Sequence, residues 1–239
     1  MLEAARKRYL DLVASVYIYN EHRGYSALDR VLEALRAKYP DHHGFIAEVE
    51  KHRDDERKHY LMFKRWFQQR GEMPYLVDRA CGQIDRMIRL TFGCHIDDLD
   101  TKAVIASDDL FAKLCRVIML TEIRGMHQVD ILLNHAFVKA DKSLMKIFHV
   151  VERDEPSHWM PYEAWLKAHD GRLPFLSEKI ADVLVHRSLV LAKLPSLYLT
   201  PGLARRTDWP DEHDPKTDRP KADRPVAQGS KPAGAPSVH

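Results

Sequence analysis

Two Glu-x-x-His pairs in this sequence could do chemistry: Glu56 with His59, and Glu155 with His158. Residues three apart on a helix project from the same side, so each glutamate and its histidine could reach one ion. Carboxylate oxygen and imidazole nitrogen suit iron or manganese better than zinc, which favours a closed site of Cys and His. One pair alone would be a weak signal in a chain with 14 His.

Two further glutamates, Glu21 and Glu122, occur in mid-helix positions where the apolar stripe would place a leucine. Four carboxylates in one apolar core would repel one another and lose hydration, so they must take up protons or bind cations. Two divalent ions would neutralise them, and two neutral histidines would complete the sites. The predicted metal ligands are therefore Glu21, Glu56, His59, Glu122, Glu155 and His158.

The chain repeats a helical hairpin. Three blocks recur in the same order about 100 residues later: Glu21-His-Arg-Gly24 as Glu122-Ile-Arg-Gly125, Asp55-Glu56 as Asp154-Glu155, and Gly71-Glu-Met-Pro74 as Gly171-Arg-Leu-Pro174. Two hairpins of long helices predict an all-α fold, a four-helix bundle with a long crossover. We place this bundle in residues 1–200, with repeat halves at about 5–76 and 105–176.

Apolar periodicity and capping residues predict the helices that carry these groups. Long helices are expected over residues 3–38, 41–70, 108–138 and 141–168, with an extra C-terminal helix over 177–193 and a shorter one over 79–90. Asp41, Asp141 and Ser177 are the expected caps. Pro156 and Pro161 fall inside the fourth helix, where they either kink it beside the metal or break it and misplace His158.

Composition limits the other classes of function. Lys and Arg number 37 against 35 Asp and Glu, a near balance that gives no support to a nucleic-acid partner. No apolar run is long enough to span a membrane. The three widely spaced cysteines predict reduced thiols, and the start lacks a signal-peptide core, so we expect a cytoplasmic protein. Residues 201–239, rich in Pro and charge, are expected to form a disordered tail.

Over roughly residues 5–170, these motifs resemble the ferritin-like superfamily of carboxylate-bridged di-metal proteins. The resemblance implies one metal held by Glu21, Glu56 and His59, and a second held by Glu122, Glu155 and His158, with two of the glutamates bridging. The expected cofactor is a pair of iron ions, with manganese or a mixed Fe/Mn pair also open. The resemblance further implies that Asp55 and Asp154 could hydrogen-bond the ligand histidines from behind.

Other residues near the ligands have less defined roles. His52, one helical turn before Glu56, is a further ligand, a group behind the ligands, or a hydrogen-bonded core histidine. Tyr17 and Tyr25 lie in helical register with the ligands and could carry an electron or a proton, although packing in the core is the ordinary role of such rings. Gly24 and Gly125 follow their glutamates by one helical turn and leave room at the metal or for close helix packing.

Three functions are consistent with this pattern. The first is a di-iron oxidoreductase, an oxidase or oxygenase that activates dioxygen to oxidise a small apolar organic substrate and needs an electron donor. The crossover and an expected aromatic lining favour it. The second is iron oxidation and storage, or disposal of peroxide, in a large assembly. The third is a metal-free helical interaction module. The oligomeric state is left open by the sequence, with a homodimer among the options.

Overall fold

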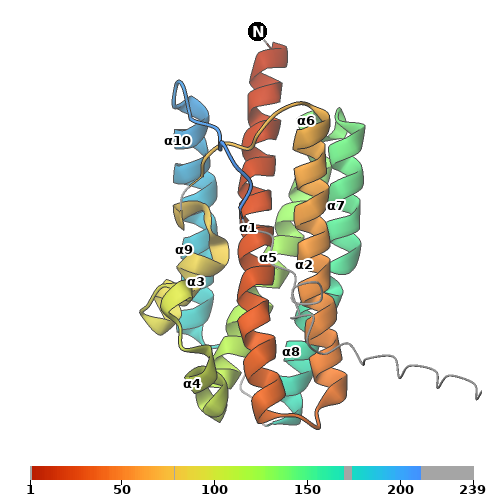
Figure 1. Cartoon of the computed structure of the whole chain (residues 1–239). Coiled ribbons are helices and arrows are strands. Elements are labelled where there is room, and N and C mark those ends of the chain that lie inside the picture. Colours follow the sequence, from red (N-terminus) through yellow and green to blue (C-terminus); the bar gives the residue numbers. More distant parts are fainter. Residues whose placement is uncertain (1, 78, 170–173, 211–239) are drawn as a thin grey trace, which may run out of the picture. The chain divides into compact units, whose positions relative to one another are not determined.

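The computed structural model describes residues 2–77, 79–169 and 174–210, and these residues are predominantly helical (Figure 1). The helices, in chain order, are α1 (Leu2–Lys38), α2 (His43–Gln69), η1 (Arg79–Cys81), α3 (Gln83–Phe92), η2 (Ile96–Asp98), α4 (Thr101–Ala106), α5 (Asp108–Asn134), α6 (Ala136–Lys139), α7 (Lys142–Asp154), α8 (Pro156–Ala168), α9 (Leu176–Ser188), η3 (Leu189–Lys193) and α10 (Leu194–Leu199). No strand occurs in these ranges, so the all-α prediction is confirmed for them.

The long helices pack in pairs. α1 lies along α2, α5 lies along α7 and α8, and α2 also contacts α7 and α8 (Figure 1). Two apolar clusters fill the space between them. On α1, Glu21 falls between Ile18 of one cluster and Leu28 of the other, and the polar residues of α2 fall between Val49 and Phe63 in the same way. The acidic and imidazole groups therefore have apolar layers on both sides along the helices.

The predicted single helix over residues 141–168 is divided at Glu155. Asp141 caps its start as expected, because its side chain accepts hydrogen bonds from two backbone amides of the first turn. Pro156 has no amide hydrogen to donate to the preceding turn, so α7 ends and α8 begins there. Glu155 nevertheless keeps helical dihedral angles, with φ −47° and ψ −44°. His158 is completely buried rather than misplaced, so the break does not remove it from the core.

Two other predicted boundaries are wrong. The third helix ends at Asn134 instead of residue 138, because His135 is extended and α6 begins a new turn. The second helix is preceded by His42, without a side-chain cap from Asp41. Its predicted end near Gly71 is correct. Gly71 has a φ of 63°, a left-handed conformation that glycine adopts without strain.

The C-terminal helix also differs from the prediction. Ser177 does not cap it: α9 begins at Leu176, and the Glu178 carboxylate accepts a hydrogen bond from the backbone amide of Phe175 at 3.0 Å. The helix does not end at residue 193 as predicted, because helical backbone continues into α10, and Pro195 lies in the first turn of α10. A short π-helical segment, η3, joins α9 to α10.

The helical unit extends past the expected boundary at residue 200 and reaches Trp209. Arg205 pairs with Asp11, a fully buried carboxylate of α1, at 2.5 Å and forms an isolated β-bridge with Tyr75. Arg70 also contacts Asp11, at 2.8 Å. Residues 201–209 are therefore ordered, contrary to the prediction. The rest of the predicted tail, residues 211–239, lies outside the described residues.

The crossover between α2 and α5 packs against α1 and α5 instead of extending away from them. Arg23 of α1 holds it by two ion pairs, one to Asp85 of α3 at 2.7 Å and one to Asp97 of η2 at 2.9 Å. None of the helices in the described part of the chain is long and apolar enough to cross a membrane. The cysteines Cys81, Cys94 and Cys115 are not joined by disulfides.

A buried ion pair attaches α9 to α5 and supplies a test of the fold. Arg116 and Glu178 are 5% and 4% exposed, and their hydrogen bonds span 2.9–3.1 Å. Glu178→Ala leaves the guanidinium buried without its partner, so we expect a loss of about 3–5 kcal/mol in the free energy of unfolding. Urea denaturation measures it. Glu163→Ala removes an exposed pair with Lys167 and should cost less than about 1 kcal/mol; equal losses would contradict the argument.

Candidate metal centre

Glu21, Glu56 and His59 form the first group of converging donors. One donor atom from each of them lies within 4.8 Å of the other two, and all three side chains are buried. His59 Nδ1 is 3.3 Å from Glu21 Oε2. These residues come from two neighbouring helices, α1 and α2, and the group matches the first predicted set of ligands.

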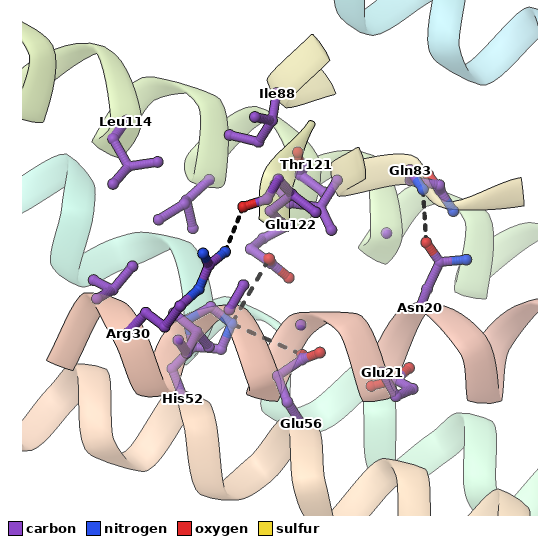
Figure 2. A pocket seen from close by; sticks show the side chains of 18 of the residues that line it. Asn20, Glu21, Arg30, His52, Glu56, Gln83, Ile88, Leu114, Thr121 and Glu122 are labelled. Carbon is purple, nitrogen blue, oxygen red and sulfur yellow. Dashed lines mark hydrogen bonds and ion pairs between the residues drawn. The ribbon is translucent and has the colours of Figure 1, made fainter. Parts of the chain in front are cut away.

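A second group gathers beside the first and shares Glu56 with it. It consists of His52, Glu56, Glu122 and His158, again with donor atoms within 4.8 Å of one another. Figure 2 shows His52, Glu56 and Glu122 of this group. His158 Nδ1 lies 3.3 Å from Glu56 Oε1 and 3.9 Å from Glu122 Oε2. Because Glu56 belongs to both groups, its carboxylate is the one placed to bridge two ions.

Glu155 lies at the edge of this second group. Its Oε2 is 3.7 Å from His158 Nδ1, and the residue is 6% exposed. All six predicted ligands are thus brought to one region, from α1, α2, α5 and the junction of α7 and α8. The sequence predicted two sets of three ligands each. In the structure the second group of donor atoms within 4.8 Å of one another contains His52 and does not contain Glu155.

An aspartate lies behind each of the two predicted histidine ligands, and each comes from the other half of the chain. His59 Nε2 is 3.2 Å from Asp154 Oδ2, and His158 Nε2 is 3.6 Å from Asp55 Oδ2. Lys58 lies between the two carboxylates, 2.6 Å from Asp154 and in contact with Asp55. In each ring one nitrogen faces an aspartate and the other faces the glutamates, the arrangement typical of metal-binding histidines.

Burial and neighbouring charges shift the pKa values of the acidic and imidazole groups in this cluster. Burial, with the nearby Glu56 charge, raises the pKa of Glu122 to about 8. Burial also raises the pKa of Glu155 well above its ordinary value, and Glu122 and Glu56 raise it further. Burial opposes protonation of His158, but Asp55 and Glu56 outweigh it and raise its pKa to about 9. The cluster therefore lacks positive charge and recruits protons in its place.

The pKa of His52 shifts in the opposite direction to that of His158. Burial, together with the neighbouring imidazoles of His158 and His59, lowers the pKa of His52 well below its ordinary value. His52 is consequently neutral at physiological pH. A neutral imidazole is the form that binds metal ions.

Several buried polar atoms of the cluster have no hydrogen-bond partner. They are His52 Nε2, both ring nitrogens of His158, Glu155 Oε2 and the Tyr17 hydroxyl. Buried polar groups are ordinarily hydrogen-bonded, so several unpaired polar atoms in one place need an explanation. Divalent ions bound by His52 Nε2, His158 Nδ1 and Glu155 Oε2 would supply partners to these three atoms, and the missing charge. The donor set of oxygen and imidazole fits such ions.

The two repeated glycines make room for two of the carboxylates. A Cβ atom at Gly24 would lie 2.3 Å from Glu56 Oε2, and one at Gly125 would lie 3.4 Å from Glu155 Oε1. Each glycine of a first helix thus faces the glutamate of the second helix in the same half. At Gly24 any side chain would displace the carboxylate that both donor groups share.

A cavity of about 110 Å³ adjoins the cluster (Figure 2). Its walls are mainly aliphatic and come from α1, α5 and the crossover: Leu28, Val31, Ile84, Ile88, Ile96, Leu99, Leu114 and Ile118. The expectation of an aromatic lining is therefore wrong for most of the wall, although Tyr17 contributes a ring. A buried water needs roughly 10–15 Å³ on this measure, so several waters or a small organic molecule would fit.

Asn20, Gln83 and Gln128 form a polar end of the cavity that we did not predict. Asn20 accepts a hydrogen bond from the Gln83 backbone amide at 2.7 Å, and the Gln83 side chain donates to Gln128 at 2.8 Å. No spacing in the sequence joins these residues, because they come from α1, α3 and α5. The two tyrosines differ: Tyr17 lines the cavity, whereas Tyr25 packs against His22 and Tyr60.

Comparison with protein-family models, with curated proteins and with solved structures gives no match.

Gly24→Ala tests whether the shared carboxylate is part of a metal site. The new methyl group would push Glu56 away from its present position, so we expect divalent-ion affinity to fall by about tenfold or more. Calorimetric titration with Co²⁺ measures it. Gly44→Ala is the matched control, since a Cβ there meets no atom within 4 Å. Unchanged affinity in Gly24→Ala would contradict a role for Glu56 in binding.

Proposed function

We propose that this chain is a ferritin-like di-metal protein that binds two iron ions between its long helices. In this proposal α1 with α2, and α5 with α7 and α8, are the two hairpins of a four-helix bundle. Support comes from the helix pairs in contact and from the repeated positions of the acidic and imidazole groups. Manganese is the other ion that these ligands would accept.

Six residues would hold the ions: Glu21, Glu56, His59, Glu122, Glu155 and His158. Their four carboxylates balance the charge of two divalent ions, which removes the repulsion that raises the pKa of Glu122. Glu56 is the residue best placed to bridge, because its oxygens approach the donors of both groups. Asp55 and Asp154 would fix the ring orientation of the two histidines from behind.

We further propose that the protein activates dioxygen to oxidise a small apolar organic molecule. Two reduced iron ions would supply electrons to dioxygen, and an external donor would return them. The observation that carries this proposal is the aliphatic cavity directly beside the carboxylates and histidines. The apolar walls would bind the substrate and exclude water from the cluster.

The same cavity bears on the alternative of iron handling or peroxide disposal. Ions passing to a storage core need a hydrated, acidic path. The four glutamates of the cluster line one part of the cavity, but the rest of its wall presents apolar residues such as Ile84, Ile88, Leu114 and Ile118. An organic substrate matches this lining better than a moving cation. Light scattering decides between the two: a large cage would favour storage, and a monomer or dimer the oxidase.

Metal content is the direct test of the proposed centre. Purified protein reconstituted with Fe²⁺ without oxygen should hold about two ions per chain, and Glu122→Ala about one, because one of the paired positions loses its carboxylate. Elemental analysis with a protein assay measures the ratio. Glu163→Ala, on the outer part of α8, should keep both ions. Wild-type protein without bound metal would rule out the di-metal proposal.

Filling the cavity separates the substrate role from the metal role. Ile88 points into the cavity from α3, and Ile88→Trp should occupy most of it (Figure 2). We expect oxygen consumption stimulated by small apolar substrates to fall by about tenfold or more, with two ions still bound. An oxygen electrode and metal analysis measure both. Full stimulated activity in Ile88→Trp would contradict the assignment of the cavity.

A further inference from the structure

We propose that His52 is a seventh metal ligand and that the two metal positions are therefore chemically unequal. The inference rests on the proposed di-metal centre and adds to it a residue outside the six repeated ligands. The internal repeat gives no partner to His52, since the corresponding position before Glu155 is Val151. The extra imidazole would belong to only one of the two positions.

The inner nitrogen of His52 faces the carboxylates without a hydrogen bond. His52 is 2% exposed, and its Nε2 lies 3.7 Å from Glu122 Oε1 and 3.8 Å from Glu56 Oε1 (Figure 2). These distances are too long for hydrogen bonds. Donors bound to one ion at about 2.0–2.2 Å each lie no more than about 4.4 Å apart. Both distances are thus compatible with one shared ion.

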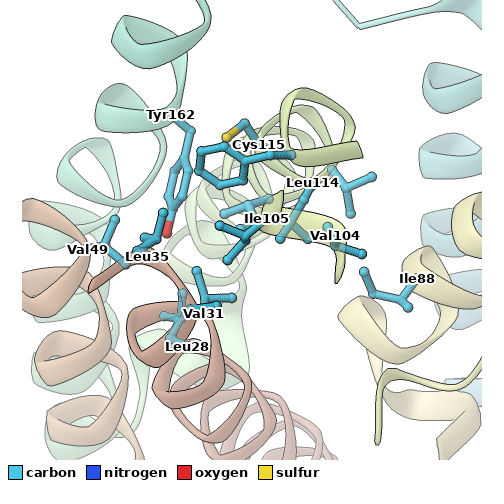
Figure 3. Close-up of a cluster of buried hydrophobic side chains, with 14 of the residues drawn as sticks. Leu28, Val31, Leu35, Val49, Ile88, Val104, Ile105, Leu114, Cys115 and Tyr162 are labelled. Atoms are coloured by element: carbon cyan, nitrogen blue, oxygen red, sulfur yellow. The ribbon is translucent and has the colours of Figure 1, made fainter. Parts of the chain in front are cut away.

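The outer nitrogen of His52 is held from behind. Its Nδ1 lies 3.2 Å from the hydroxyl of Tyr162, which is fully buried in the apolar cluster beside the site (Figure 3). Asp154 and Asp55 have the same place behind His59 and His158. A ring that donates from Nδ1 to Tyr162 leaves Nε2 free to bind a metal ion. Each of the three histidines therefore has a polar side chain behind its ring, and the one behind His52 is neutral.

An ordinary core histidine would be satisfied at both nitrogens. His52 is satisfied at one, and its other nitrogen has no hydrogen-bond partner. Its ring also stacks on His158, with centroids 4.3 Å apart and planes at 23°. The stack directs His52 Nε2 and His158 Nδ1 toward the same two carboxylates, Glu56 and Glu122. Two imidazoles and two carboxylates make this the nitrogen-rich position.

The other position has one imidazole, His59, with Glu21 and the shared Glu56. Imidazole raises the affinity of a site for Fe²⁺ and Co²⁺ relative to one built from oxygen alone. The two ions should therefore bind in sequence, with the position beside His52 filled first. A centre built only from the six repeated ligands would give no reason for this order.

Cobalt-loaded protein tests the inference directly. In anaerobic Co²⁺ titrations followed by visible absorption, wild-type protein should bind two ions in distinguishable steps. His52→Ala and His52→Gln should weaken one step by at least about tenfold and leave the other unchanged. His149→Ala, at an exposed histidine of α7, should match the wild type. Imidazole added to His52→Ala should restore part of the lost affinity, which a purely structural role would not allow.

Proton NMR supplies a readout on the unaltered chain. Each histidine bound to Co²⁺ gives one strongly shifted, exchangeable N–H signal, so we expect three in the wild type and two in His52→Gln. Only two signals in the wild type, or unchanged Co²⁺ affinity in both variants, would overturn the assignment of His52. Wild-type protein that binds no ion would instead overturn the di-metal proposal, so the two failures are distinguishable.

Discussion

The fold is organised around the need to compensate four carboxylates buried between helices. Removing an ion from water costs several kcal/mol even after the protein relaxes, so these groups cannot be left without partners. Raised pKa values of Glu122, His59 and His158 favour their protonated forms, which compensate part of this negative charge. Apolar layers lie on both sides of these groups along the helices. The surrounding packing thus holds four carboxylates and the histidines together in one place between the helices.

Positioning depends on contacts that cross between the two halves of the chain. Asp154 reaches His59, Asp55 reaches His158, and Lys58 contacts both aspartates. Neither half could hold its own histidine in this way. Because these contacts join the two halves, each donor group keeps its geometry only when α2 is docked against α7 and α8.

Pro156 interrupts the helix between α7 and α8, and this interruption changes the backbone hydrogen bonds around Glu155. Without the proline, Glu155 would lie inside one regular helix, and the amide of His158 would donate to the carbonyl of Asp154. With it, Glu155 stands at a junction, and the His158 amide donates instead to the carbonyl of Glu155 at 2.9 Å. The Ser157 hydroxyl donates to the carbonyl of Asp154, which therefore does not lack a partner. Helical direction is kept while the last turn before His158 is reshaped.

The sequence by itself determined what depends on local spacing. Apolar periodicity predicted the long helices, and the placement of Glu21 and Glu122 among apolar residues predicted buried carboxylates. Only the tertiary structure decided the cavity, the pairing of His52 with Tyr162 and the division of the donors into unequal groups. These features join residues far apart in the chain, from α1, α2, α5 and α8. Their geometry depends on how helices dock, and no periodicity along one helix records that.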